Sequence, residues 1–425
     1  MGRPRLNRAG RGGFLKIVVC LILVLIGRVV AQETEEMAPK LDAAQHKALA
    51  DWLRVEYAQP AADWPKAEID EGRPREEIGA LDWKPTGTKE EHRLGLSLFF
   101  DPRLSKSQGV SCASCHEPQL GWSNGVAYAF GEYREQLTRH PPTLVGVSLQ
   151  KKLFWDGRAD TLEQQAHDVI LNPVEMNGDP KEVVSRLEKE KGYYGPLFEK
   201  AFGDATITFE RILSALAAFE RAIPAGRTKF DRFAKGDVNA LTDTELVGLN
   251  LFRTKARCMN CHQGPMFTDG DFHNVGLTYY GRRLQDLGRY KQTGKAEDVG
   301  KFRTATLRNV GRTAPYMHNG VFPSLEGLLR LYNAGMPHPK PKDGQKDDPL
   351  FPVTSVHLKP LGLTPQELAD LRDFLLALNE PPSRVLIPPV PPIHKVEAAN
   401  DLPVKGQDNL ATPATDAGPA MASEE

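Results

Sequence analysis

The sequence predicts a mainly α-helical chain built around two small helical domains of similar construction. Segments with helical apolar spacing and helix-start signals recur along the chain, whereas the alternating apolar and polar runs typical of strands are scarce. In addition, a capping box, a Gly-Leu-x-Leu-Phe segment and a Cys-x-x-Cys-His motif follow one another twice in the same order. This repeated order predicts that the two domains are related by internal duplication.

The first copy begins with a capping box at residues 88–91, Thr-Lys-Glu-Glu. The segment Gly-Leu-Ser-Leu-Phe follows at 95–99, and a loop leads to Cys-Ala-Ser-Cys-His at 112–116. Residues 208–223 carry apolar side chains at helical spacing and predict an amphipathic helix. We therefore assign residues 88–235 to an N-terminal domain.

The second copy begins with a capping box at residues 242–245, Thr-Asp-Thr-Glu. Gly-Leu-Asn-Leu-Phe follows at 248–252, and Cys-Met-Asn-Cys-His follows at 258–262. A helix is expected at 364–378, because a proline occupies its first position and a glutamate completes a third capping box. Residues 236–382 are therefore assigned to a C-terminal domain.

Three further segments flank the two domains. Residues 1–31 have the pattern of a signal peptide, in which arginines precede an apolar run and Ala31 ends a small-residue cleavage site. Residues 32–87 are polar and predict an extension and linker with a helix at about 42–58. Residues 383–425 form a Pro- and Ala-rich tail that carries too little apolar surface to order itself.

The signal peptide predicts export to the periplasm. Its uncharged run is too short to cross a bilayer comfortably, so no stable membrane span is expected after cleavage; an uncleaved N-terminal anchor is the alternative. The chain has 425 residues and a formal net charge of −1, and no basic block follows the N-terminal cluster. This charge pattern argues against a nucleic-acid partner.

The two Cys-x-x-Cys-His motifs predict covalent attachment of c-type haem. Each thiol can add to one vinyl group of the porphyrin, and the adjoining histidine places an imidazole under the iron. Cleavage of the signal peptide removes Cys20, so every remaining cysteine lies in a motif. The residues expected to hold the two haems are Cys112, Cys115, His116, Cys258, Cys261 and His262. A disulfide, a zinc half-site and a thioredoxin-like pair are the alternatives for such cysteines.

Several other segments resemble the bacterial di-haem cytochrome c peroxidase and MauG family. They are Arg-His-Pro-Pro-Thr at 139–143, Phe-Trp-Asp-Gly-Arg at 154–158, Leu-Glu-Gln-Gln at 162–165, Asn-Pro-Val-Glu-Met at 172–176, Phe-Arg-Thr-Ala-Thr-Leu-Arg-Asn at 302–309 and Thr-Ala-Pro-Tyr at 313–316. The resemblance runs from about residue 88 to 378. It implies two cytochrome c-like haem domains, two covalently bound c-type haems and reaction with hydrogen peroxide.

In that family the first haem reacts with peroxide and the second stores electrons or oxidising equivalents. The resemblance implies that His116 and His262 are the proximal iron ligands and that Glu175 and Gln165 lie beside the open face of the first haem. A carboxylate there can move a proton between the oxygens of peroxide. The resemblance also makes Trp155 a relay between the haems. The residues alone favour simpler interpretations, in which Glu175 is a helix-end carboxylate in solvent and Trp155 is a core side chain.

Two positions depart from typical peroxidases of the family. Those enzymes carry a histidine that caps the first iron in a loop where this chain has Glu132, which predicts an open first haem as in MauG; His140 swinging inward is the alternative. Peroxidases also place a methionine on the second iron where this chain has Tyr332, as MauG-like enzymes do. A phenolate stabilises ferric and higher states. Met336, four residues on, is the alternative ligand.

The resemblance further implies a Ca²⁺ ion between the domains, held partly by backbone carbonyls at Thr313 and Pro315. The family's asparagine ligand corresponds to His140 in this chain.

The sequence therefore predicts a periplasmic di-haem enzyme with MauG-like chemistry, in which peroxide supplies the oxidising equivalents for an aromatic residue, typically tryptophan, on a partner protein. One alternative is a cytochrome c peroxidase that reduces peroxide with electrons from a small cytochrome c or a cupredoxin. Another is a di-haem electron carrier without substrate chemistry. Many relatives are dimers, so a homodimer is also an expectation.

Overall fold

The computed structural model describes residues 41–381 and 384–393, and it is mainly helical, as predicted. The signal peptide, the start of the extension and most of the tail lie outside these residues. The helices are α2 (Ala43–Glu56), α3 (Lys89–Phe99), α4 (Leu162–Leu171), α5 (Pro180–Lys189), α6 (Lys191–Phe202), α7 (Phe209–Arg221), α8 (Lys229–Ala234), α9 (Asp243–Arg253), α10 (Tyr290–Thr293), α11 (Leu325–Asn333) and α12 (Pro365–Leu376). Strands β1 (Phe272–His273) and β2 (Phe302–Arg303) pair antiparallel.

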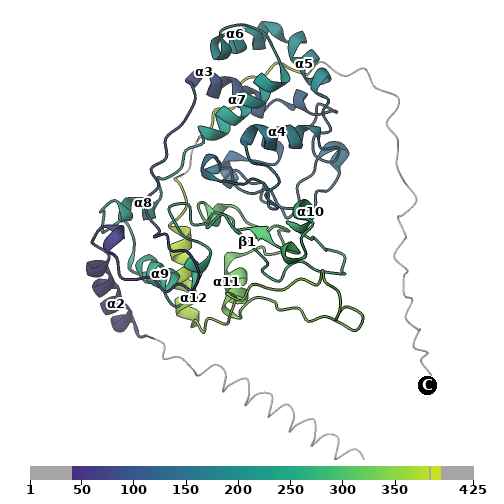
Figure 1. Ribbon diagram of the computed structural model, residues 1–425. Coiled ribbons are helices and arrows are strands. Elements are labelled where there is room, and N and C mark those ends of the chain that lie inside the picture. Colours follow the sequence, from purple (N-terminus) through teal and green to yellow (C-terminus); the bar gives the residue numbers. More distant parts are fainter. Residues whose placement is uncertain (1–40, 382–383, 394–425) are drawn as a thin grey trace, which may run out of the picture. The chain divides into compact units, whose positions relative to one another are not determined.

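The described residues up to Val390 belong to one compact unit with two hydrophobic cores. Figure 1 shows α3 to α7 grouped around one core and α8, α9, α11 and α12 around the other. Among the described residues, no helix combines the length and the apolar character needed to cross a membrane.

The first core is organised by the crossing of α3 and α7. The capping box predicted at the start of α3 is present, with the Thr88 side chain accepting from the Glu91 amide. Gly95 lies at the crossing, where a Cβ atom would come within 1.9 Å of the Ala215 carbonyl oxygen and 2.6 Å of the Phe219 Cβ. The absence of a side chain at Gly95 therefore lets the two helices touch through their backbones.

The second core repeats this crossing with α9 and α12. The capping boxes predicted at Thr242 and Thr364 are both present. A Cβ atom on Gly248 would come within 2.0 Å of the Asp370 carbonyl oxygen and 2.7 Å of the Phe374 Cβ. The same helix pair, with a glycine at the same place in the repeated segment, is the arrangement that an internal duplication produces; the duplication itself stays a prediction.

Alanine at either glycine is expected to destabilise the fold. Gly95→Ala and Gly248→Ala each force a methyl group against a backbone carbonyl, and overpacking of this kind costs about 1–3 kcal/mol or more. The control is Gly192→Ala in α6, where no atom lies within 4 Å of the new Cβ; it should gain up to about 1 kcal/mol. Chemical denaturation of the three variants measures the difference, and equal stability of Gly95→Ala and Gly192→Ala would contradict the crossing.

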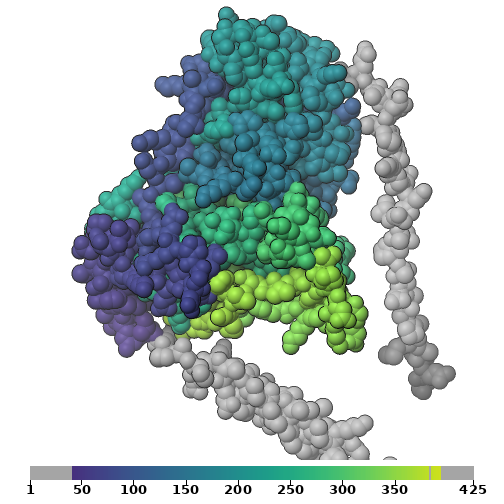
Figure 2. Space-filling model, viewed as in Figure 1, coloured from purple at the N-terminus to yellow at the C-terminus, as the bar shows by residue number. Residues whose placement is uncertain are grey.

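The N-terminal extension packs against the second core instead of forming a linker. Helix α2 contacts α9, and Tyr57, Trp64 and Ile78 are buried in the same core as Phe252. Arg253 in α9, which is fully buried, forms an ion pair with Glu77. In Figure 2 the N-terminal residues, in purple, lie directly against the green and yellow residues of the C-terminal half. The predicted helix of this segment is confirmed as α2, but the expected linker is wrong.

Helix α8 also packs with the C-terminal half. Phe230 and Phe233 belong to the second core, whereas Ala225 belongs to the first. Packing therefore divides the chain just before α8, a few residues earlier than the boundary expected at residue 235.

Between the helices, long loops with short turns carry the two Cys-x-x-Cys-His motifs and line the functional sites.

Candidate active site and haem sites

The first Cys-x-x-Cys-His motif lies in the wall of a cavity of about 570 Å³. Cys112, Cys115 and His116 all line this cavity, because the motif begins with a single tight turn that brings the three side chains to one side. The His116 Nδ1 donates to the Trp122 carbonyl oxygen at 2.9 Å. Burial lowers the pKa of His116, which keeps the ring neutral and leaves Nε2 with a free lone pair for iron.

The second motif is built in the same way around a smaller cavity of about 240 Å³. Cys258, Cys261 and His262 line it, and the motif again begins with a tight turn. The His262 Nδ1 donates to the Phe267 carbonyl oxygen at 2.9 Å, and burial lowers the pKa of His262. Both histidines are therefore held in the tautomer that presents Nε2 to a metal.

The four cysteines fit haem attachment better than the alternatives. Each is a free thiol, so neither pair forms a disulfide. Burial raises the pKa of Cys115 to about 11 and that of Cys258 to about 12, which is unlike the low pKa of a redox-active pair. Each cavity thus offers two thiols and one oriented imidazole within a mostly apolar wall. This donor set suits a c-type haem.

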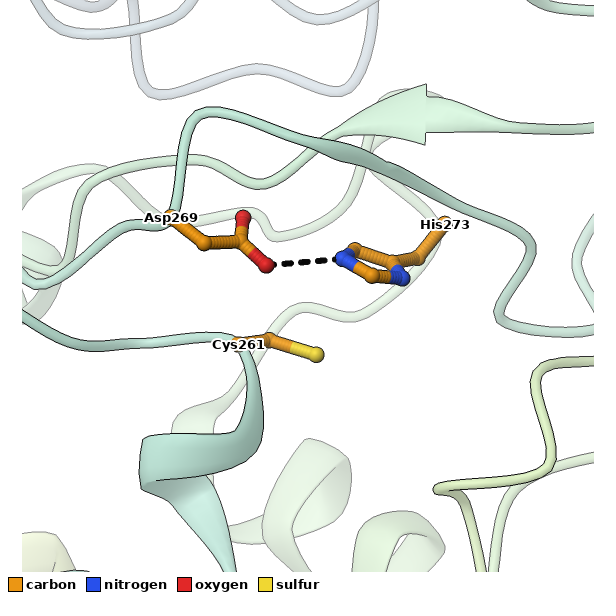
Figure 3. A group of neighbouring side chains, drawn as sticks. All are labelled: Cys261, Asp269 and His273. Atoms are coloured by element: carbon orange, nitrogen blue, oxygen red, sulfur yellow. Dashed lines mark hydrogen bonds and ion pairs between the residues drawn. The ribbon is translucent and has the colours of Figure 1, made fainter. Parts of the chain in front are cut away.

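Cys261 also lies close to Asp269 and His273, as Figure 3 shows. The His273 Nε2 and the Asp269 carboxylate are 2.8 Å apart, and Asp269 also pairs with Arg73. Burial alone would lower the pKa of His273, but its bonds to Asp269 and Cys261 raise it to about 9. Once Cys261 is a haem thioether its sulfur carries no charge, so the three side chains do not form a separate metal site; they form a polar edge beside the second haem.

Glu175 and Gln165 both line the first cavity, as their predicted roles require. Gln165 projects from α4, and Glu175 lies in the turn that follows this helix. The Asn172 Nδ2 donates to Glu175 Oε1 at 3.0 Å, and the Arg158 Nη2 lies 3.9 Å from the same oxygen. A carboxylate, two amides and a guanidinium therefore converge on one side of the cavity.

Burial dominates the electrostatics of Glu175. It raises the pKa of Glu175 above that of an ordinary glutamate, although Arg158 and Asn172 oppose the shift. The side chain is 21% exposed, so it keeps access to the cavity and to protons from solvent. A carboxyl group with a raised pKa in this position can both accept and return a proton.

Glu132, at the position of the missing capping histidine, does not face the first cavity. Its carboxylate accepts hydrogen bonds from the backbone amide and the hydroxyl of Ser107, both at 3.0 Å, and the residue is 1% exposed. The Glu132 amide donates to the Glu175 carbonyl oxygen at 2.8 Å. Gly131 allows this approach, because a Cβ there would lie 2.0 Å from the Val174 carbonyl oxygen. The loop therefore supports Glu175 instead of offering a ligand.

The environment of His140 does not fit the calcium ion that the resemblance implies. The His140 Nδ1 lies 2.9 Å from the Val126 carbonyl oxygen, and Nε2 lies 2.9 Å from the Ser123 hydroxyl and 3.2 Å from the Thr313 carbonyl oxygen. The His140 ring thus already contacts the Thr313 carbonyl oxygen that was expected to bind Ca²⁺. In addition, Ca²⁺ takes oxygen ligands, and an imidazole offers only nitrogen. Pro315 lines the second haem cavity.

Chelation is therefore expected to leave the protein unchanged. Because His140 links Ser123 and Val126 to Thr313 without a metal, dialysis against a calcium chelator should alter neither the haem spectrum nor the thermal midpoint. Metal analysis of the purified chain should find less than one calcium per protein. A stoichiometric calcium whose removal lowers the midpoint would contradict this assignment.

The two cavities share part of their walls. The residues that line both are His140, Pro141, Pro142, Thr143, Gln150, Trp155 and Arg303. The Trp155 Nε1 donates to the His140 carbonyl oxygen at 2.8 Å, and the Trp155 carbonyl oxygen accepts from the Arg303 amide at 2.8 Å. Trp155 is therefore held from both halves of the chain, its indole by His140 and its backbone by Arg303, at the boundary between the two cavities.

Tyr332 and Met336 differ in their relation to the second cavity. Tyr332, in α11, lines the cavity together with His262. Its pKa is raised by burial and by the nearby Cys261 and Cys258, and its hydroxyl makes no hydrogen bond to any residue of 41–381 or 384–393. Met336 is 5% exposed and packs outside the lining of this cavity. The geometry thus favours Tyr332 over Met336 as a distal ligand.

Two residues of the site were not singled out by the sequence, although both lie in recognised segments. Arg158, the last residue of Phe-Trp-Asp-Gly-Arg, lies beside Glu175 and stacks on Phe154 at 3.3 Å from the ring centroid. Arg303 lies in the wall shared by both cavities. The presence of an arginine in each recognised segment was the available signal, but only the fold shows what each guanidinium faces.

Two cavities, each with two thiols and one oriented imidazole, in a mainly helical fold define a di-haem c-type protein. A family model described as "Di-haem cytochrome c peroxidase" matches residues 89–239. The methylamine utilization protein MauG of Methylorubrum extorquens is 39% identical over 307 residues, which cover 72% of this chain and 82% of that protein. The chain belongs to the di-haem cytochrome c peroxidase/MauG family, whose members are oxidoreductases that carry two haems.

Peroxidases of the family are nearly as similar. The cytochrome c551 peroxidase of Nitrosomonas europaea is 38% identical over 234 residues, covering 55% of this chain and 70% of that protein. The cytochrome c peroxidase IdrP2 of a Pseudomonas species is 35% identical, covering 68% of this chain and 81% of that protein. A solved MauG-like protein associated with microbial copper homeostasis superposes with a TM-score of 0.62 at 27% identity, covering 74% of this chain and 95% of the other. Overall similarity therefore does not separate the two activities.

Proposed function

We propose that this protein reacts with hydrogen peroxide at the first haem and uses the two oxidising equivalents to oxidise an aromatic residue, typically tryptophan, on a partner protein in the periplasm. The observation that carries the proposal is the position of Tyr332 in the wall of the second haem cavity, with Met336 outside it. A phenolate on the second iron favours ferric and higher states and suits storage of oxidising equivalents. A methionine would favour the reduced iron of an ordinary peroxidase.

An open first haem supports the same proposal. Glu132 is turned toward Ser107, and His140 would have to give up contacts with Ser123, Val126 and Thr313 to reach an iron. These observations support an iron that accepts peroxide without prior reduction of the other haem.

The side chains around the first haem have separate tasks. A bound c-type haem supplies an iron whose electrons reduce the O–O bond. Glu175 takes a proton from the peroxide oxygen nearer the iron and returns it to the outer oxygen, which leaves as water. The Arg158 guanidinium and the Asn172 amide hold the Glu175 carboxylate toward the cavity. Gln165 lines the same cavity and can donate a hydrogen bond to peroxide.

Trp155 is proposed to carry electrons between the haems. It lines both cavities, and its indole is fixed by a hydrogen bond to the His140 carbonyl oxygen. An aromatic ring between the two sites divides one long electron transfer into two shorter ones. Trp155→Phe should therefore slow the appearance of oxidising equivalents at the second haem while peroxide still reacts at the first.

The competing function is peroxide reduction with electrons from a small cytochrome c or a cupredoxin. Hydrogen peroxide added to the ferric protein without a donor distinguishes the two. The proposal predicts an oxidised state that retains both equivalents for minutes and decays faster when the protein partner is added. Rapid decay alone, with fast turnover only on addition of reduced cytochrome c, would support the peroxidase. A carrier without substrate chemistry would not consume peroxide at all.

A further inference from the structure

Arg303 differs from every other buried arginine among the described residues. Arg103, Arg253 and Arg308 are buried to a similar degree, and each forms an ion pair with a carboxylate at 3.0, 2.6 and 2.9 Å respectively. Arg303 is 5% exposed and forms no ion pair with any described residue. A guanidinium keeps its proton at any ordinary pH, so this charge cannot be relieved by deprotonation.

The contacts of Arg303 leave part of its guanidinium free. Its Nε donates to the Phe154 carbonyl oxygen at 3.2 Å, and Nη1 makes a long contact of 3.5 Å with the Thr304 carbonyl oxygen. Nη2 has no partner within the described part of the chain. Burial lowers the pKa of Arg303 to about 10, with no carboxylate to oppose the shift. An unpaired buried charge of this kind costs several kcal/mol unless an anion joins it.

The position of Arg303 indicates which anion would pair with its guanidinium. It is the only residue with a fixed positive charge in the wall shared by the two described cavities. Each cysteine pair lines only one cavity, so no attachment cysteine belongs to the shared wall. In a c-type haem the thioether edge and the edge that carries the two propionates are on opposite sides of the ring. A propionate of either haem that reaches the shared wall would meet Arg303 as the only fixed positive charge in that wall.

The other arginines that line the two cavities are paired with carboxylates. Arg139 lines the first cavity and pairs with Asp286 and Asp156 at 2.6 and 2.7 Å. Arg257 lines the second cavity and pairs with Asp70. The charge of Arg303 has no such partner among the described residues.

We propose that Arg303 binds haem propionates at the boundary of the two sites and that its single charge raises the midpoint potential of both haems. A positive charge near a haem stabilises the reduced iron relative to the oxidised iron, and the effect is large where water is excluded. Strand β2 and the hydrogen bond between the Arg303 amide and the Trp155 carbonyl oxygen hold the backbone of Arg303 against that of Trp155 in the shared wall. The inference depends on the two haems and not on which substrate they oxidise.

The test is a redox titration of the full-length haem-loaded protein, with resonance Raman spectra of the propionate bending bands. In Arg303→Met the midpoint potentials of both haems should fall, and propionate bands of both should shift. In Arg303→Lys the charge is kept but the planar fork is lost, so the potentials should stay near wild type while the bands still shift. The matched control is Lys291→Met, since Lys291 lines only the first cavity and is half-exposed; it should leave the second haem unchanged.

Unchanged potentials in Arg303→Met, or a change at one haem only, would overturn the proposal. If Arg303→Met fails to mature with haem, Arg303→Lys provides the test. Propionate bands identical to wild type in Arg303→Lys would also overturn the proposal. These measurements need no peroxide and no partner protein. The proposed oxidation of a partner can therefore fail while the role of Arg303 stands, and the reverse also holds.

Discussion

Glu175→Gln is expected to slow the reaction with hydrogen peroxide by about 10²–10⁴-fold, the range that a positioned acid–base group contributes. Glutamine keeps the shape of the side chain and its contact with Asn172, but it cannot take a proton from peroxide. Both haems should remain attached, because Glu175 contacts neither motif histidine. Stopped-flow measurement of the spectral change after mixing with peroxide gives the rate.

The pH dependence of this rate provides a second test of the role of Glu175 in proton transfer. Burial raises the pKa of Glu175, so the proton-accepting form is lost on acidification at a higher pH than for an ordinary glutamate. The wild-type rate should fall as pH drops through that raised pKa, and Glu175→Gln should lack this limb. The control is Glu199→Gln, which changes an exposed carboxylate in α6 that lines neither cavity; it should leave both rate and profile unchanged. Equal rates for Glu175→Gln and Glu199→Gln would contradict the proton-transfer role.

Tyr332→Phe is expected to have the second large effect, on the second haem alone. Removal of the phenolic oxygen deletes the proposed distal ligand, so this haem should change from low spin to high spin. Its midpoint potential should rise by a sizeable fraction of the ~0.8 V range that axial ligands span, because the phenolate no longer stabilises ferric iron. The oxidised state formed with peroxide should also lose its long lifetime.

Met336→Leu is the matched control for this variant. Met336 packs outside the lining of the second cavity, so a leucine of similar volume should leave the spectrum of the second haem intact. Electron paramagnetic resonance and visible spectroscopy compare the two variants. A changed spectrum in Met336→Leu together with an unchanged one in Tyr332→Phe would reverse the ligand assignment.

The helices and the haem-binding residues could be predicted from sequence because their signals are local. The capping boxes at Thr88, Thr242 and Thr364 specify helix starts through contacts three residues apart, and all three are present. In each Cys-x-x-Cys-His motif the attachment residues are adjacent along the chain. The paired glycines Gly95 and Gly248 fell within repeated segments, but their role in helix crossing depends on partners more than a hundred residues away.

The remaining features depend on contacts that no local pattern reports. The extension looked like a linker because its apolar residues are sparse, yet Trp64 and Ile78 complete the core around Phe252. The environment of His140 depends on Ser123 and Val126 from one loop and on Thr313, which lies 173 residues away from His140 along the chain. Arg303 is distinguished by having no carboxylate partner among the described residues, a property that only the folded chain reveals.

The central claim is that one pentapeptide motif serves two functions, with His116 under an open iron and His262 under an iron closed by Tyr332. Electron paramagnetic resonance of the resting ferric protein tests it most directly, followed by cyanide addition without any reductant. We predict one high-spin and one low-spin haem, with cyanide converting only the high-spin signal. Two low-spin haems in the resting protein, with no cyanide binding until one haem is reduced, would contradict the account.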